Sequence, residues 1–512
     1  MYGMQLIEQR SIDSKNNRAM FWRHPRMMTS VVSIEAWERF SFYGMQAILG
    51  FYLYYSIADG GLGIAKKDAT ALIGAYGALV YLCTFIGGWV GDHLLGAEKT
   101  LLSGAALLVI GHISLSTFPG FYGLAIGLPL IAVGSGLLKT AAITVLGAVY
   151  DENPKQRETG FQFFYLGIQL AAFFGPLLTG WLTQQYSFHI GFIAAAFLMI
   201  IGISLYVFAR PAAMASLCTQ TRQRITQPQL TATTTQAIFI VGGSTLALFC
   251  ATFCVATGLI KPVVLATFLL ALTLGAALLL YTSMFRSSEV TPAEKIQLLR
   301  YIPIFLASVA FWAIMNQTYG VLAVYSDVRL NRSVGNFLIP AAWLQSLNPF
   351  YVFVLSLPLA YLWLRLGDRS PRPATKLSIG VGIAGLGFAI LIPYAGGEPN
   401  STPFIVLAIS ILVTAIGELL IGPIGMAATA QYAPRKYATQ FSAMFFLTMA
   451  IGTALSGHIS QYYNPDNAQA EARYFIACSA TAMVIGIISY MLTRIITTKT
   501  QELPLVGNEN RR

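Results

Sequence analysis

The sequence predicts an all-α protein that crosses a lipid bilayer fourteen times. Of its 512 residues, 56% are hydrophobic and only 10% are charged, whereas soluble domains contain about 25% charged residues. The mean hydropathy is +0.64. The apolar residues also fall into long runs bounded by charges or by proline and glycine. Most runs reach the roughly 20 residues that span the hydrocarbon core.

These runs give the order of the predicted helices along the chain. They lie at 31–55, 69–91, 100–118, 121–150, 159–183, 189–210, 236–257, 262–285, 300–327, 338–364, 376–396, 403–431, 437–461 and 472–497. We expect two six-helix bundles and an inserted helix pair, at 31–210, 300–497 and 236–285. The remaining segments read as an N-terminal arm, two linkers and a tail, at 1–30, 211–235, 286–299 and 498–512.

The distribution of lysine and arginine predicts the orientation of the chain. These residues gather in the N-terminal arm, the C-terminal tail and alternate loops such as 210–224 and 286–300. The positive-inside rule therefore predicts that both termini are cytoplasmic. The net charge of +11 is spread over these loops, where it meets anionic lipid. We expect membrane lipid as a partner, and no nucleic acid.

The first predicted span contains three charged residues in the hydrocarbon region. Glu35, Glu38 and Arg39 are spaced to share one helical face, with Tyr43 one turn beyond Arg39. Charges at this depth are expensive unless they face protein or water, so this helix should line a polar cavity. Because two carboxylates share one arginine, one of them can hold or release a proton. We expect this trio to be the proton-coupling site.

Residues 35–44 read E-A-W-E-R-F-S-F-Y-G. This string resembles the first-helix signature of the proton-dependent oligopeptide transporter family, within the major facilitator superfamily. The resemblance implies a major facilitator fold and proton-coupled import of di- and tripeptides by alternating access. It also implies that no cofactor is needed beyond the coupling protons. Bacterial members carry an extra helix pair, so we expect a bacterial plasma (inner) membrane protein, and a monomer.

A loop motif and two further charges extend the resemblance. G-D at 91–92, echoed by L-G-D-R-S-P-R-P at 366–373, resembles a major facilitator motif in which Asp92 would pin neighbouring helix ends. The pattern G-x-G-x-x-K ends at Lys139, and G-E-L-x-x-G-P-x-G contains Glu418. The resemblance implies that Lys139 joins Arg39 in binding the substrate carboxylate, and that Glu418 accepts the peptide amino group. Gly422 and Pro423 should kink or weaken the helix of Glu418 for gating.

Charge alone supports the same class of substrate. Two cations on one wall of the cavity and an acid on the facing half of the protein complement a zwitterion of variable length. Further polar groups are assigned to the substrate site: Tyr43, Tyr81, Gln169, Asn316, Gln345 and Asn348. Some positions depart from the family pattern. Asn316 replaces an acid and Gln169 an asparagine, while Phe42 and Ala141 replace polar residues. These changes suggest weaker peptide binding or a narrowed substrate set.

Two alternatives remain open. The chain could carry another carboxylated solute, such as an amino acid or a peptide-like drug, or it could be a peptide sensor without transport. An enzyme is not expected, since the sequence has no G-x-S-x-G or H-E-x-x-H motif and its five histidines lack metal-ligand spacing. We expect no metal site.

Overall fold

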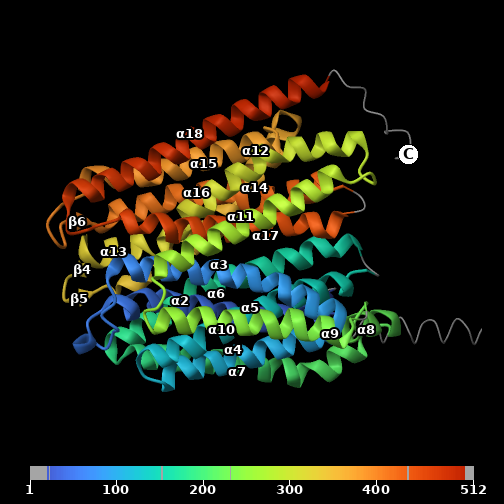
Figure 1. The fold of residues 1–512 in the computed structure, drawn as a ribbon, viewed down its shortest axis with the longest axis horizontal. Helices are drawn as coiled ribbons and strands as arrows, with labels where there is room; N and C mark the ends of the chain where they lie inside the picture. Colours follow the sequence, from blue (N-terminus) through green and yellow to red (C-terminus); the bar gives the residue numbers. More distant parts are fainter. Residues whose placement is uncertain (1–19, 22–23, 152–153, 231, 435–436, 502–512) are drawn as a thin grey trace, which may run out of the picture. The chain divides into compact units, whose positions relative to one another are not determined.

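The structure, a computed structural model, describes residues 20–21, 24–151, 154–230, 232–434 and 437–501 (Figure 1). Thirteen helices of these described residues are long and apolar enough to cross a membrane. The first predicted span forms helix α2 (Arg26–Tyr54), whose 29 residues are also long enough to cross. Its charged residues lower its hydropathy below that of the other thirteen. The prediction of an all-α polytopic membrane protein is confirmed.

The chain separates into two compact units. Unit 1 comprises residues 1–45 and 83–256, and unit 2 comprises 46–82 and 257–512. The predicted division placed 46–82 in the first bundle and kept the inserted helix pair together, whereas these units place 46–82 in unit 2 and separate the two inserted helices. Residues 46–82 belong with unit 2 because they pack closely against its helices. A methyl group at Gly74, for example, would collide with the backbone of Gly457.

Unit 1 contains the first part of α2 and the end of α3 (Lys66–Val90), followed by a π-helical turn, η2 (Gly91–Leu95). Its remaining helices are α4 (Ala97–Thr117), α5 (Gly120–Val149), α6 (Pro154–Gln185), α7 (Phe188–Ala215), α8 (Thr219–Thr226), α9 (Thr234–Ala237), η3 (Ile238–Gly242) and α10 (Gly243–Ala256). The short strands β1 (Met20–Phe21) and β2 (His24–Pro25) pair antiparallel before α2.

Unit 2 contains the rest of α2 and α3, with η1 (Ile57–Asp59) between them. Its other helices are α11 (Pro262–Arg286), α12 (Pro292–Met315), η4 (Asn316–Thr318), α13 (Val321–Val328), η5 (Ala341–Ser346), α14 (Leu347–Leu366), η6 (Gly367–Arg369), α15 (Pro373–Ala389), η7 (Ile392–Tyr394), α16 (Phe404–Tyr432), α17 (Ala438–Ile459), η9 (Ser460–Tyr462) and α18 (Ala468–Gln501). Two-residue strands pair as β3 (Leu330–Asn331) with β6 (Thr402–Pro403), and β4 (Ser333–Val334) with β5 (Phe337–Leu338).

In both units, glycine residues let one pair of helices pack closely. In unit 1, α4 packs along α5, and a Cβ atom at Gly104 would lie 2.6 Å from the Gly134 carbonyl oxygen. In unit 2, α15 packs between α16 and α18 (Figure 1), and a Cβ atom at Gly417 would lie 2.7 Å from the Gly380 carbonyl oxygen. Small residues let membrane helices approach until their backbones touch. The two pairs occupy equivalent places in the predicted six-helix blocks.

Three segments predicted as linkers or tail are partly helical. α12 begins at Pro292 because Thr291 and Glu294 form a capping box, with each side chain accepting from the other residue's backbone N–H. α7 continues through Pro211 to Ala215, and α8 follows within the predicted linker at 211–235. α18 extends to Gln501, past the predicted end at 497.

Candidate functional site

α2 places Glu35, Glu38 and Arg39 in one buried cluster in unit 1. The Arg39 Nε–H group donates to Glu35 Oε1 at 2.9 Å, and Nε also lies 2.8 Å from Glu38 Oε2. All three side chains are at most 4% exposed. Glu35 Oε2 and Arg39 Nη2 are buried without a hydrogen-bond partner among the described residues. The prediction that the three charges share one helical face is confirmed.

α5 adds a hydroxyl group and an ammonium group to this cluster. Ser135 Oγ donates to Glu38 Oε1 at 2.9 Å. Lys139, one turn later on α5, lies close enough for the charges of Arg39, Glu35 and Glu38 to act on it. The structure therefore brings Arg39 and Lys139 into one electrostatic cluster. The contribution of Ser135 was missed, although its place one turn before Lys139 on the same face could have indicated it.

Aromatic side chains lie beside Arg39 in unit 1, and α6 packs against α2. The Arg39 guanidinium carbon lies 5.6 Å from the centre of the Phe42 ring, a cation–π distance. The Phe42 ring in turn meets Tyr43 edge to face at 5.7 Å. Gln169 is buried in α6, and its amide nitrogen donates to the Tyr165 hydroxyl at 2.8 Å. Phe42 stands where the family pattern has a tyrosine. The phenylalanine ring keeps the cation–π contact with Arg39, and only the hydroxyl group is lost.

Unit 2 holds the predicted acid on α16. Asn348, at the start of α14, donates its side-chain N–H to Glu418 Oε2 at 2.7 Å. Gln345, in η5 just before α14, donates to the Ala47 carbonyl oxygen at 3.3 Å. Asn348 Oδ1 and Gln345 Oε1 are both buried without a hydrogen-bond partner among the described residues. The structure therefore brings Glu418 and Asn348 together and leaves acceptor atoms of both amides available.

The other predicted positions in unit 2 have structural surroundings of their own. Asn316 follows the last residue of α12 and donates its amide N–H to the Trp312 carbonyl oxygen at 2.8 Å. Tyr81 is half-buried in α3. α16 stays helical through Gly422 and Pro423. Proline lacks a backbone N–H, so the carbonyl of residue 419, next to Glu418, loses its usual helical donor. The gating roles of Gly422 and Pro423 stay predictions.

Asp327, which the sequence analysis did not single out, joins α13 to the end of α2 in unit 2. It accepts hydrogen bonds from the Tyr54 hydroxyl at 3.0 Å and the Tyr55 hydroxyl at 2.9 Å. Arg332 Nη2 also donates to Asp327, at 3.1 Å. Together with the contact of Gly74 with Gly457, these bonds join residues 46–82 to the other helices at this end of unit 2. By the predicted topology, this is the external end.

Asp92 does not pin neighbouring helices through its side chain in this conformation. The π-helical turn at 91–95 leaves the Asp92 carboxylate exposed, and it makes no hydrogen bond or ion pair within the described part of the chain. Its backbone carbonyl oxygen accepts from the Leu230 N–H at 2.9 Å. The side-chain role of Asp92 stays a prediction, for a conformation other than this one.

Two ion pairs with a buried carboxylate were also missed. Glu471 accepts from Arg329 Nε at 3.2 Å, from the Tyr463 hydroxyl at 2.8 Å and from the Gly396 N–H at 2.6 Å. Arg329 also donates to the carbonyl oxygens of Gly397 and Pro465. In unit 1, Arg210 Nη2 donates to Glu98 Oε2 at 2.9 Å. The partners are more than 100 residues apart in the chain, so no local spacing indicates either pair.

Comparison with known families identifies the architecture. The profile of the POT family matches residues 98–476. The chain belongs to the POT family. A di-/tripeptide transporter of Lactococcus lactis subsp. cremoris is 32% identical over 492 residues, which cover 93% of this chain and 96% of the relative. The uncharacterized transporter YclF of Bacillus subtilis (strain 168) is 34% identical over 498 residues, covering 96% and 98%.

Solved structures of POT transporters have the same fold. A peptide transporter POT in complex with sulfate aligns with a TM-score of 0.85 and 33% identity, covering 93% of this chain and 96% of that one. A POT family transporter in complex with 5-aminolevulinic acid aligns with a TM-score of 0.86 and 29% identity, covering 94% and 98%. The predicted major facilitator fold and the predicted transporter family are therefore confirmed.

Proposed function

We propose that this protein imports di- and tripeptides together with protons, by alternating access. The observation that supports this most directly is the cluster on α2, where one arginine serves two buried carboxylates and keeps an unpartnered Nη2. Buried polar groups in proteins are nearly always paired. A buried charge cluster left partly unsatisfied inside a membrane helix is therefore best explained by a ligand and a proton that complete it.

The carboxylate of the peptide is assigned to Arg39 and Lys139. The unpartnered N–H groups at Arg39 Nη2 can donate to a carboxylate oxygen, and a charge-assisted bond of this kind contributes about 1.5–3 kcal/mol. Lys139 adds a second positive charge acting on the same cluster. While both glutamates are ionised, their two negative charges compete with the peptide carboxylate for both cations.

The amino group of the peptide is assigned to Glu418 and Asn348. Within the described part of the chain, Glu418 Oε2 accepts one hydrogen bond, from Asn348, so a carboxylate with several acceptor positions keeps room for an ammonium group. Asn348 Oδ1 is a further buried acceptor. Side chains of the peptide need no charged partner in this scheme, in keeping with relatives that are named for di- and tripeptides rather than for one sequence.

Proton coupling follows from competition for Arg39. When one of the two glutamates is protonated, the cluster holds one carboxylate and one guanidinium, and Arg39 is released to bind the peptide. Asn316 is not ionisable, so position 316 cannot supply the proton site here, and Glu35 and Glu38 are the groups that we assign to it. The membrane potential contributes about 2.3 kcal/mol per charge per 100 mV to the transport.

Uptake by the purified protein in liposomes tests this proposal. We expect labelled dialanine to accumulate when the outside is acidic and the inside is electrically negative, and to equilibrate without accumulation when protons are allowed to leak across. Unlabelled dialanine should compete, whereas alanine should not. No accumulation of dialanine under the imposed gradient would contradict the proposal.

A second candidate is transport of another carboxylated solute. The neighbour solved with 5-aminolevulinic acid favours it, since that ligand carries an amino and a carboxylate group without a peptide bond. The non-polar replacements Phe42 and Ala141 would also remove hydrogen bonds from a peptide site and so weaken peptide binding or reduce the set of substrates. In the same liposomes, 5-aminolevulinic acid that competes at lower concentration than dialanine would support this candidate over peptide import.

The remaining parts of the proposal concern the membrane. We propose a bacterial plasma (inner) membrane location with both termini cytoplasmic, which the lysine- and arginine-rich loops support. Protons are the only coupling partner, without a cofactor, and one chain is the transporting unit. Epitope tags at both ends test this orientation. We expect antibodies to bind both tags only after the membrane is permeabilised.

A further inference from the structure

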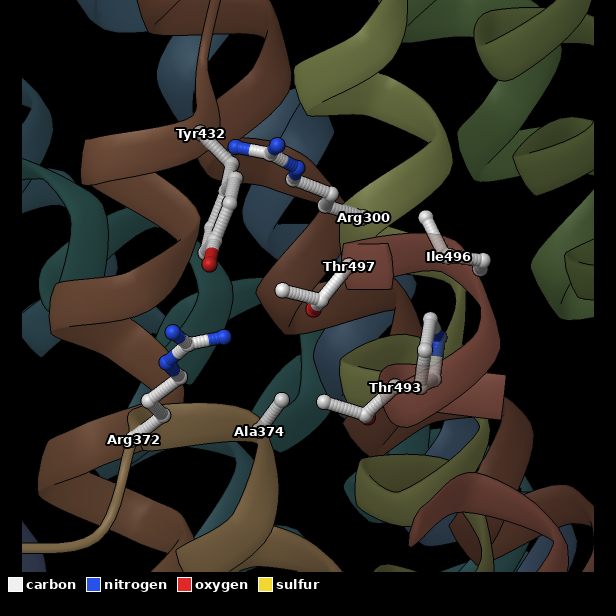
Figure 2. A pocket seen from close by; sticks show the side chains of 8 residues that line it. Arg300, Arg372, Ala374, Tyr432, Thr493, Ile496 and Thr497 are labelled. Atoms are coloured by element: carbon white, nitrogen blue, oxygen red, sulfur yellow. The ribbon is translucent and has the colours of Figure 1, made fainter. Parts of the chain in front are cut away.

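A basic hollow in unit 2 lies outside the residues assigned to transport. It has a volume of about 250 Å³ and is formed by the first half of α12, the start of α15 and the ends of α16 and α18. Its lining residues are Arg300, Pro303, Arg372, Ala374, Tyr432, Thr493, Ile496 and Thr497 (Figure 2). This volume is below the roughly 300–1,000 Å³ of pockets for drug-sized ligands. The hollow therefore suits a compact chemical group.

The lining is positively charged and carries no acid. Arg300 comes from α12 and Arg372 from the residue before α15, and the lining contains no Asp or Glu side chain. Figure 2 shows the Tyr432 hydroxyl and the Arg372 guanidinium pointing toward one another, with Thr497 entering from α18 on the other side. Two like charges at one hollow repel each other, and an anion that both contact removes this repulsion. Guanidinium groups suit phosphate in particular, because their planar N–H pairs match two of its oxygens.

The backbone strengthens the same preference. Pro373 is the first residue of α15, and the capping residue Arg372 makes no side-chain hydrogen bond to the helix. The N–H of Ala374, in the first turn, therefore has no partner in the helix itself. The 17 residues of α15 also direct the positive end of the helix dipole to this edge of the hollow.

The place of the hollow in the fold suggests where the phosphate comes from. The hollow lies at the end of unit 2 that the basic loops predict to be cytoplasmic, where anionic lipids lie. One wall is α18, whose other face exposes Ile487, Met491 and Ile495. A helix is about 10 Å across with its side chains, so the hollow lies about one helix width from an apolar surface that a bilayer would cover.

We propose that this hollow binds the phosphate group of an anionic membrane lipid, held by Arg372, Arg300 and the Tyr432 hydroxyl. The lipid would join the inner ends of α12, α15, α16 and α18. This role is independent of the transported substrate, so the proposed function can fail while this site stands.

Lipid binding by the purified full-length protein tests the proposal. The protein is placed in nanodiscs of phosphatidylcholine with increasing phosphatidylglycerol, and the unfolding midpoint and the bound lipid are measured. The variants are Arg372→Gln and Arg300→Gln. The matched control is Arg369→Gln, which removes the same charge from an exposed residue of the same loop that does not line the hollow. A separate arm titrates inorganic phosphate against chloride in detergent.

We expect phosphatidylglycerol to raise the unfolding midpoint of the wild type and of Arg369→Gln. Arg372→Gln should bind the lipid at least about tenfold more weakly, since it loses a charge-assisted contact, while unfolding normally in phosphatidylcholine alone. A response to inorganic phosphate without one to phosphatidylglycerol would keep the phosphate site and overturn the lipid as its source. Equal responses of Arg372→Gln and Arg369→Gln, or no response to either probe, would overturn the proposal.

Discussion

Replacing Glu38 by Gln should separate proton coupling from substrate exchange. The substitution keeps the shape of the side chain, and the amide oxygen can still accept from Ser135 Oγ, which lies 2.9 Å from Glu38 Oε1. It removes the charge that lies 2.8 Å from Arg39 Nε. The variant therefore resembles the state in which Glu38 is permanently protonated, with Glu35 and Arg39 left as a balanced pair.

The size of the effect follows from the driving force on one proton. A potential of 100 mV contributes about 2.3 kcal/mol per charge, and a pH difference of one unit adds about 1.4 kcal/mol. Together they allow a neutral zwitterion to accumulate about 500-fold with each proton carried. Without coupling, the ratio falls to about one. The free energy of unfolding should change little, because Glu35 still pairs with Arg39 at 2.9 Å.

The assay compares two measurements in the same liposomes. Accumulation of labelled dialanine is driven by an imposed proton gradient and potential, and exchange is measured by counterflow with unlabelled dialanine inside. Glu38→Gln should lose accumulation and keep counterflow. The matched control, Glu398→Gln, makes the same chemical change at an exposed loop residue and should behave as the wild type. Full accumulation by Glu38→Gln would refute the assignment of Glu38 as the coupling group.

Three further substitutions test the attachment of α2 to α13, the stability of the fold and the recognition of the peptide amino group. Asp327→Asn replaces two charge-assisted bonds from Tyr54 and Tyr55 by neutral ones, which weakens the attachment of α2 to α13 by about 2 kcal/mol. A cysteine at the buried Thr318, in a background without native cysteines, should then react faster with an impermeant thiol reagent from outside. An unchanged rate would show that these bonds do not limit access to Thr318. Glu471→Gln leaves Arg329 buried without its counter-charge, so the free energy of unfolding should fall by about 3–5 kcal/mol; a fall no larger than that of Glu398→Gln would contradict this. Glu418→Gln should weaken dialanine binding about tenfold or more but leave N-acetyl-dialanine, which lacks the amino charge, unaffected; equal losses for both ligands would show that Glu418 does not contact the amino group.

The helices of this protein could be predicted closely because membrane spans are set by a single physical demand. A run of about 20 apolar residues must form a helix to satisfy its backbone in lipid. Their ends were harder to predict, because polar caps and surface turns decide them. α12 begins at Pro292 through the capping box of Thr291 and Glu294, a pattern that the sequence does contain but that hydropathy alone passes over.

The charged cluster on α2 could be predicted because its partners lie three and four residues apart, a spacing that one helix brings together. The hydroxyl group of Ser135, which contacts this cluster from α5, could not be predicted. Ser135 reaches Glu38 from a helix 97 residues away, and a serine between two glycines reads first as a small packing residue. Asn348 and Glu418 lie 70 residues apart, and only the family resemblance assigned both to one site.

Two groups of buried charges in this protein differ in how many of their polar atoms have hydrogen-bond partners. This difference distinguishes a structural ion pair from the cluster assigned to transport. Glu471 accepts three hydrogen bonds and Arg329 reaches two carbonyl groups besides, so this pair has a full set of partners and holds loops and helix ends of unit 2 together. The cluster of Glu35, Glu38 and Arg39 is as deeply buried but leaves Arg39 Nη2 and Glu35 Oε2 unpartnered among the described residues. A partly satisfied network is unstable by itself and is retained where another species completes it. Neutralising a member of the first pair should therefore destabilise the fold, whereas neutralising Glu38 should leave the stability nearly unchanged and the transport uncoupled.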